Sequence, residues 1–177
     1  MKLYIGASKS NYIASWLIRQ YIKKSYNHIY VRYKDPFTEQ DIISESSHGE
    51  AHKILISKWY LKNRIVEEYV IDCTEIRFKS ILSKINERLQ ASYSELNIIG
   101  IIIYDFGEKL NSNLIKNTAN LFKDGASSTI CSESVAFTLR LFGVQFKRPL
   151  DFVRPDHIIE RLAKLSITED YINKVTL

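Results

Sequence analysis

Residues 125–136 read Gly-Ala-Ser-Ser-Thr-Ile-Cys-Ser-Glu-Ser-Val-Ala, and this stretch is the most informative part of the chain for its fold. Small and polar residues lead into Cys131, and an apolar pattern with helical spacing begins directly after it. The pattern predicts a helix over residues 131–142, ended by Gly143, with the thiol at its N-terminus. Backbone N–H groups without intrahelical partners and the positive end of the helix dipole lie there. Thiols in such positions ionise more readily, and the same N–H groups can hold an oxyanion, so Cys131 is a candidate nucleophile.

Length and composition predict one globular domain spanning residues 1–177, with 45% apolar and 25% charged residues. The longest apolar run, residues 98–104, is far shorter than the roughly 18 residues that a membrane span needs. The first residues lack the long apolar core of a secretion signal. We therefore expect no transmembrane segment and a cytoplasmic location.

The cysteine count and the net charge limit the functional classes that are compatible with this sequence. Cys73 and Cys131 are too few for a disulfide framework, which favours a reducing compartment, and Cys73 is expected to be a buried small hydrophobe. The net charge of +5 is only mildly basic, and Lys and Arg are scattered along the chain. Charge alone therefore gives little support to nucleic-acid binding, which stays open as a less favoured class.

Periodicity predicts a mixture of strands and helices. Alternating or β-branched stretches predict strands at residues 2–6, 26–33, 41–47 and 65–73. Helical spacing of apolar residues predicts helices at residues 11–24, 75–90, 131–142 and 155–165. We expect serines at positions 8–10 to cap the first helix, a helical turn near residues 59–64, and a short helix or ordered loop at 114–122. The apolar run at 98–106 fits a buried helix or a strand equally well.

His28 is the candidate partner of the thiol. A strand is a rigid platform for an imidazole that must reach a sulfur atom within hydrogen-bond distance. A third group usually orients such an imidazole, and Glu45 lies on the next predicted strand. Antiparallel pairing of the two strands would bring the Glu45 carboxylate beside the ring. The alternatives are a satisfied core histidine and an exposed strand glutamate.

The other histidines and the glycine-containing segment at residues 6–10 give weaker evidence for a functional site. His48 and His52 flank Glu50, but the spacing is not His-Glu-x-x-His and no Cys-x-x-Cys pair accompanies it, so no metal is expected. Residues 6–10 lack the glycine spacing of a phosphate-binding loop. His157, at the start of the last predicted helix, is expected on the surface. No cofactor is required.

Three segments carry a family resemblance: the histidine strand at residues 25–31, the glutamate strand at 42–45 and the cysteine segment at 130–136. They resemble the permuted papain-like thiol hydrolases, the circularly permuted branch of the NlpC-related superfamily, with YiiX-like proteins nearest. The resemblance covers most of residues 1–156, although Asn27 stands where a serine is common and Ser46 where an alanine is usual. It implies an α+β fold, with a central antiparallel sheet that carries His28 and Glu45, packed against helices, one of which presents Cys131 at its N-terminus.

These residues together predict a cysteine hydrolase of the peptidase or amidase type. Cys131 would attack the carbonyl of a peptide, amide or ester substrate and form an acyl-enzyme, His28 would move the proton, and Glu45 would orient His28. Two alternatives stay open. One is a lipid or other acyl-transfer enzyme of the same fold, and the other is a binding module without turnover.

Overall fold

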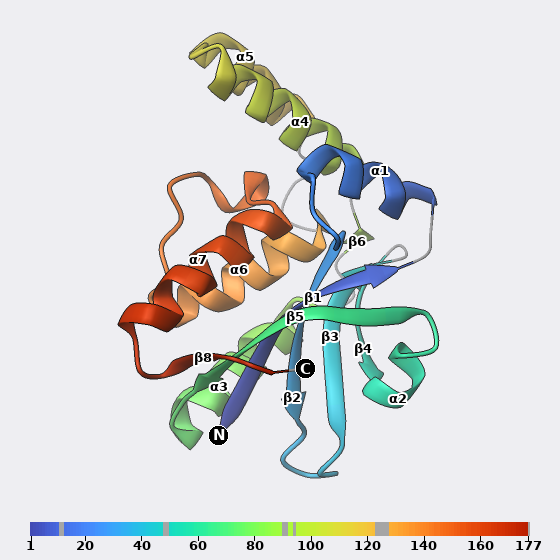
Figure 1. The fold of residues 1–177 in the computed structure, drawn as a ribbon, viewed down its shortest axis with the longest axis vertical. Coiled ribbons are helices and arrows are strands. Elements are labelled where there is room, and N and C mark those ends of the chain that lie inside the picture. The colour runs from blue at the N-terminus through green and yellow to red at the C-terminus, as the bar shows by residue number, and fades with distance from the viewer. Residues whose placement is uncertain (11–12, 48–49, 90–91, 94, 123–127, 177) are drawn as a thin grey trace.

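A largely antiparallel sheet forms the centre of this α+β structure (Figure 1). The computed structural model describes residues 1–10, 13–47, 50–89, 92–93, 95–122 and 128–176. The sheet has the strand order β7-β6-β4-β3-β2-β1-β5-β8, and every pair of neighbours is antiparallel except β6 and β7. The strands are β1 (Lys2–Ser10), β2 (His28–Lys34), β3 (Asp41–Ser47), β4 (Glu50–Leu55), β5 (Asn63–Asp72), β6 (Ser92–Tyr93), β7 (Ser128–Thr129) and β8 (Ile172–Lys174).

The helices α3, α6 and α7 contribute to the core on one face of this sheet, whereas α2 packs against the other face. The helix α6 packs against β2 and β3 and lies beside α7, and α4 and α5 project away from the sheet next to α1 (Figure 1). Among the described residues, no helix combines the length and the apolar character needed to span a membrane. The helices are α1 (Ile13–Ile22), α2 (Ile56–Trp59), α3 (Glu75–Glu87), α4 (Glu95–Lys109), α5 (Asn113–Thr118), α6 (Cys131–Leu141) and α7 (Pro155–Thr168), with 3-10 turns η1 (Ala119–Phe122) and η2 (Leu150–Phe152).

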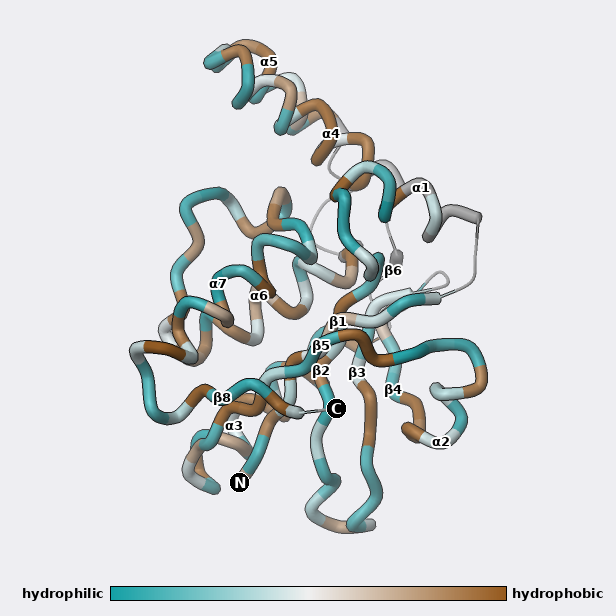
Figure 2. Tube along the Cα trace, in the orientation of Figure 1, coloured by the Kyte–Doolittle hydropathy of each residue, from teal (hydrophilic) through white to brown (hydrophobic). Residues whose placement is uncertain are grey.

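The main core lies between the sheet and α6. Alternate residues of β1 and β2, such as Ile5 and Val31, point to the same face and are almost wholly buried, as the period of a strand requires. Val135 and Leu139 of α6 complete this core. Figure 2 shows the apolar residues along the central strands and in much of α4.

A smaller cluster covers the opposite face of the sheet. Tyr30, Ile43 and Trp59 form it, with the Tyr30 and Trp59 ring centroids 4.8 Å apart. Tyr30 lies directly across from Gly6 in the β1–β2 register, and a Cβ at Gly6 would overlap the Tyr30 ring. Glycine at this position is therefore required by the close approach of the ring.

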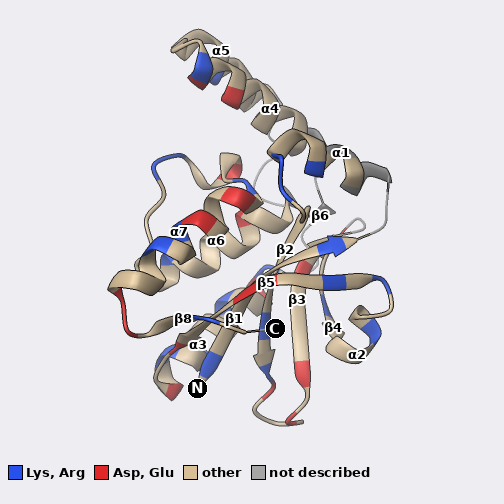
Figure 3. Cartoon of the chain, in the orientation of Figure 1, with Lys and Arg blue, Asp and Glu red and all other residues tan. Residues whose placement is uncertain are grey.

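Charged residues are distributed over many elements. On the face drawn in Figure 3, described Lys and Arg residues alternate with Asp and Glu residues over the sheet and the helices. This distribution agrees with the scatter of lysines and arginines along the sequence.

The structure corrects several expected boundaries. β1 continues through Ser10 instead of ending at Gly6, so Ser8 and Ser10 are buried strand residues and not helix caps. Strand pairing of β1 with both β2 and β5 satisfies the backbone there and outweighs the capping preference of serine. The ambiguous run at 98–106 is the helix α4.

Residues 50–55 form β4, a strand that the sequence did not predict. Its residues are mostly polar or half-exposed, so they lack the apolar alternation by which a strand is recognised. The helical turn expected near residues 59–64 lies earlier in the sequence, as α2 at residues 56–59. The short strands β6, β7 and β8 were not predicted. Two- and three-residue strands carry too little periodicity to be recognised from sequence.

Candidate active site

Two neighbouring strands place His28 and Glu45 side by side. His28 is the first residue of β2 and Glu45 lies within β3, and these strands pair antiparallel with Val31 opposite Ser44. The His28 Nε2 atom lies 2.7 Å from the Glu45 Oε2 atom. Both residues are buried, with relative exposures of 8% and 7%. The antiparallel pairing expected from the sequence therefore brings this imidazole and this carboxylate into contact.

The third predicted residue, Cys131, is the first residue of α6 and has a relative exposure of 7%. Its side chain lies next to the His28 ring, close enough to raise the pKa of that ring. Because Nε2 of the ring contacts Glu45, Nδ1 is the nitrogen left for the sulfur. Sulfur, imidazole and carboxylate thus form a continuous chain from the start of α6 through β2 to β3.

Backbone donors lie beside the sulfur. Ile130 precedes α6 in an extended conformation, with φ −111° and ψ 164°. The N–H of Ser134 donates to the Ile130 carbonyl at 3.1 Å, so the N–H groups of Cys131 and Ser132 precede this first hydrogen bond of the helix. Donors in this position, reinforced by the helix dipole, suit an oxyanion that forms next to the thiol.

The charge state of the His28 ring is set by its neighbours. Burial lowers the pKa of His28, but the negative charges of Glu45 and of the Cys131 thiolate, with hydrogen bonds to both, outweigh burial and raise it to about 10. The ring is therefore a cation at neutral pH. An imidazolium in contact with a carboxylate and with a cysteine side chain is the arrangement expected of a Cys–His pair.

Glu45 is held by more partners than the sequence indicated. The Trp59 Nε1 atom donates to Oε2 at 2.7 Å, and the Ser47 hydroxyl donates to Oε1 at 3.0 Å. The His52 Nε2 atom lies 3.5 Å from Oε1. Burial alone would raise the pKa of Glu45, but the charge and hydrogen bond of His28, followed by the His52 and Trp59 contacts, bring it well below its usual range.

Trp59 and His52 are site residues that the sequence did not reveal. His52 lies directly opposite Glu45 in the β3–β4 register, and its pKa is raised chiefly by its hydrogen bond to Glu45. Recognition of β4 as a strand would have placed His52 beside Glu45. Trp59 of α2 contacts the Glu45 carboxylate, and no local sequence pattern predicts that contact.

The metal alternative involved His48 and His52. His48 lies outside the described residues, and His52 contacts Glu45 and the Glu50 carbonyl. In the part of the chain that the structure describes, no group of three or more His, Cys, Asp or Glu side chains could hold a metal ion.

Cys73 differs from the expectation of a buried cysteine. It is partly exposed, and its sulfur lies 3.7 Å from the Met1 carbonyl oxygen. Burial is still the main reason that its pKa is raised above the ordinary value for a thiol. The two cysteines therefore lie in different surroundings, and only Cys131 is in contact with His28.

His157 is also corrected, since it is half-buried and not a surface residue. Its Nδ1 atom accepts the backbone N–H of Arg154 at 3.2 Å at the start of α7. Burial, followed by the positive charge of Arg148, lowers the pKa of His157 to about 4. The ring is therefore neutral at pH 7 and acts as a hydrogen-bond acceptor.

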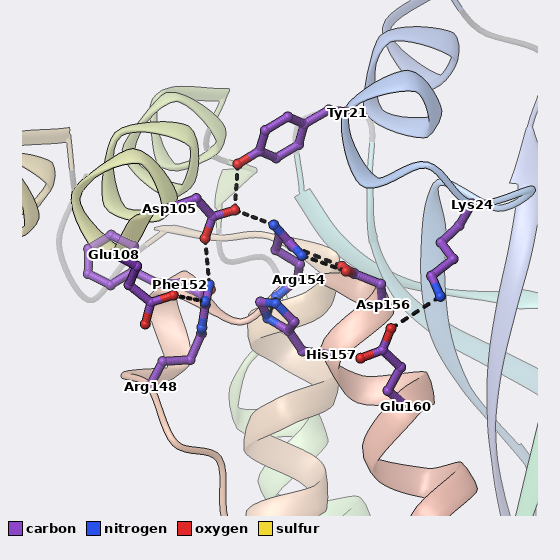
Figure 4. A network of polar contacts seen from close by, with 10 residues as sticks. All are labelled: Tyr21, Lys24, Asp105, Glu108, Arg148, Phe152, Arg154, Asp156, His157 and Glu160. Carbon is purple, nitrogen blue, oxygen red and sulfur yellow. Dashed lines mark hydrogen bonds and ion pairs between the residues drawn. The ribbon is translucent and has the colours of Figure 1, made fainter. Parts of the chain in front are cut away.

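A network of polar contacts joins α1, α4 and the segment before α7 (Figure 4). Asp105 of α4 is its centre: its carboxylate accepts from the Tyr21 hydroxyl at 2.5 Å and from Arg148 at 2.7 Å. Arg154 also contacts Asp105 and pairs with Asp156 at 2.6 Å. Asp105 is buried, with a relative exposure of 6%, so the network clamps these elements together.

Next to Cys131 and this network lies a cavity of about 40 Å³. Its walls come from α1, α4, the start of α6, Asn27 and residues 154–155, and five of the eleven lining residues are isoleucines. Cys131 and Ser132 both line this cavity, so the candidate nucleophile borders an open space.

Comparison with known proteins adds nothing to this geometry, because no protein-family model and no curated protein matches the chain.

Proposed function

We propose that this protein is a cysteine hydrolase that cleaves an amide or ester bond through an acyl-enzyme, on a permuted papain-like fold. The observation that carries the proposal is the chain of contacts from Cys131 through His28 to Glu45. A buried imidazole bridging a thiol and a carboxylate, at the N-terminus of a helix, is the arrangement that nucleophilic cysteine catalysis needs.

The chemistry follows from these positions. The Cys131 thiolate attacks the substrate carbonyl carbon, and the oxygen that becomes negative is held by the N–H groups at the start of α6. His28, as the imidazolium, gives its proton to the leaving amine or alcohol as the carbon–heteroatom bond breaks. Water then attacks the thioester and passes a proton to His28, and the carbon–sulfur bond breaks to restore the thiolate and release the acid.

Glu45 acts through His28 and is a positioning residue. It holds Nε2 of the ring and stabilises the imidazolium, while Trp59 and Ser47 hold the carboxylate in place. No step requires a metal or an organic cofactor. A reducing compartment, as expected from the sequence, suits a nucleophile that must stay a free thiol.

Transfer of the acyl group to an acceptor other than water is the second candidate function. Five isoleucines line the cavity beside Cys131, and Cys131 and His28 are nearly buried. Restricted access of water favours attack on the thioester by a bound acceptor. Product analysis with water and with an added amine or alcohol distinguishes the two reactions.

Alkylation of the two thiols at pH 6 tests the proposal. At this pH an ordinary thiol is almost wholly protonated, and burial raises the pKa of Cys73 further. We expect iodoacetamide to label Cys131 at least about tenfold faster than Cys73, measured by mass spectrometry of the two peptides. His28→Ala should remove the difference, and Cys131→Ser identifies the labelled peptide. Equal and slow labelling of both thiols would instead support a binding module without turnover.

A further inference from the structure

The cavity beside Cys131 has a size and a chemistry that define a substrate group. We propose that it is a subsite for a short aliphatic group of three to four carbon atoms, adjacent to the scissile carbonyl. This subsite rests on the proposed function, since it is defined relative to the Cys131 nucleophile.

The aliphatic part of the cavity wall consists of five isoleucines. Ile18 and Ile22 of α1 face Ile98 and Ile101 of α4, and Ile130 adjoins Cys131. A β-branched side chain has few accessible rotamers, so isoleucine walls keep a defined shape and do not adapt to many ligands. The subsite should therefore discriminate by size.

Three polar side chains in the walls, those of Asn27, Tyr21 and Arg154, are engaged in hydrogen bonds or ion pairs with other residues. Asn27 accepts from the Ser10 N–H at 3.1 Å and from Arg19 at 2.8 Å, and its amide nitrogen lies 3.1 Å from the Ser10 hydroxyl. Tyr21 donates to Asp105, and Arg154 is paired with Asp105 and Asp156. A polar or charged substrate group would lose its water and gain little in return, so the geometry selects an aliphatic group.

The volume sets the length of that group. A site for one water molecule needs about 10–15 Å³ on the same measure, so about 40 Å³ accommodates three to four atoms of that size. The side chain of valine or leucine and the chain of a butanoyl group both fit this number. Enlargement is resisted because the Asp105 network ties α4 to Tyr21 of α1 and to Arg154, both of which line the cavity.

The first experiment compares N-methyl-, N-butyl- and N-decyl-iodoacetamide on the full chain at pH 6. The Cys131/Cys73 labelling ratio is measured for each reagent, so that Cys73 corrects for reagent reactivity. Each buried methylene favours binding by about fourfold, so the ratio should rise roughly 60-fold from methyl to butyl. It should not rise further from butyl to decyl, because the cavity is then full.

Two substitutions at one position test whether the cavity causes this preference. Ile98→Phe fills the space and should reduce the butyl/methyl ratio to about 1, whereas Ile98→Ala enlarges the space and should move the optimum to a longer chain. Ile99→Phe is the matched control, since Ile99 adjoins Ile98 but is 45% exposed and does not line the cavity. It should keep the wild-type preference. Circular dichroism verifies that each variant is folded.

A further arm distinguishes the two sources of an aliphatic group. Turnover of p-nitrophenyl butanoate is compared with that of the acetate, and turnover of the N-acetylvaline ester with that of the N-acetylglycine ester. Preference for butanoate assigns the subsite to an acyl chain, and preference for N-acetylvaline assigns it to a residue of a peptide.

The outcomes separate this inference from the proposed function. Fast, His28-dependent labelling of Cys131 that ignores chain length would overturn the subsite and leave the hydrolase proposal standing. A ratio that rises steadily to decyl would overturn the size limit. Slow labelling of Cys131 by every reagent would overturn the hydrolase proposal itself.

Discussion

At the scale of single residues, Glu45 is the most heavily coordinated group of the candidate site. One buried carboxylate meets two histidines, an indole N–H and a hydroxyl. Such a group cannot move without breaking several charge-assisted hydrogen bonds, so it fixes the orientation of His28. The Glu45 contacts should therefore control the reactivity of a sulfur atom that Glu45 itself does not touch.

Trp59→Phe tests this control. The substitution keeps an aromatic ring beside Tyr30 and removes the donor to Glu45. We expect labelling of Cys131 by iodoacetamide at pH 6 to slow by up to about tenfold, which corresponds to a loss of about 1.4 kcal/mol. Tyr60→Phe is the control, because Tyr60 is half-exposed and makes an edge-on ring contact with Trp59. An unchanged rate in Trp59→Phe would mean that the indole only fills space.

At the scale of secondary-structure elements, the local sequence pattern determines where α6 begins, whereas a contact between strands constrains the register of β1 against β2. α6 begins at Cys131, as its sequence predicts, since small polar residues give way there to apolar residues at helical spacing. The register of β1 against β2 depends instead on a contact across strands, where Tyr30 lies over Gly6. Glycine is needed at two positions for two different reasons, and substitution can separate them.

Gly6→Ala and Gly143→Ala form a matched pair. A Cβ at Gly6 would overlap the Tyr30 ring, whereas a Cβ at Gly143 meets nothing within 4 Å but would sit on a backbone with φ +81°. We expect Gly6→Ala to lower the free energy of unfolding by about 3 kcal/mol through overpacking. Gly143→Ala should cost only about 1 kcal/mol, from backbone strain. Urea denaturation monitored by circular dichroism measures both, and equal losses would contradict the role of the Tyr30 contact.

At the scale of the whole molecule, the Asp105 network joins segments that are distant in sequence. Tyr21 and Asp105 are 84 residues apart, and Arg154 is a further 49 residues along the chain. The network holds α1 and α4 against the segment before α7, beside the cavity and the cysteine (Figure 4). Stability and the shape of the cavity should therefore change together when it is broken.

Asp105→Ala removes the centre of this network. It leaves Arg148 and Arg154 with one acidic partner each, Glu108 and Asp156, in a partly buried site. We expect the free energy of unfolding to fall by about 3 kcal/mol, and the preference of Cys131 for the butyl reagent to weaken. Lys24→Ala breaks the exposed pair with Glu160 nearby and should cost less than about 1 kcal/mol. Similar losses in the two variants would show that Asp105 contributes no more than a surface pair.

Two histidines should make the free energy of unfolding depend on pH, and the slope should have opposite signs below and above about pH 6.5. The pKa of His28 is raised to about 10, so its contribution is complete below 6.5 and is lost as the pH rises toward 10. The pKa of His157 is lowered to about 4, so its contribution is complete above 6.5 and is lost as the pH falls toward 4. Each slope is at most about 1.4 kcal/mol per pH unit. The raised pKa of His52 acts in the same direction as that of His28.

Urea denaturation between pH 5 and pH 9 measures these slopes. His28→Gln should flatten the decline above pH 6.5, and His157→Gln should flatten the decline below it. A wild-type protein whose stability rises steadily from pH 6.5 to pH 9 would contradict the charged state assigned to His28.

The sequence by itself determined the features that depend on neighbours along the chain. The start of α6 at Cys131, the strand that contains His28 and the strand that contains Glu45 all follow from periodicities of two and 3.6 residues, which are local properties of the backbone. Only the tertiary structure decided that His52 and Trp59 surround Glu45, that His157 is half-buried, and that isoleucines of α1 and α4 line a cavity beside Cys131. These features depend on packing between segments that are far apart in sequence, and no local repeat encodes which distant side chains will meet.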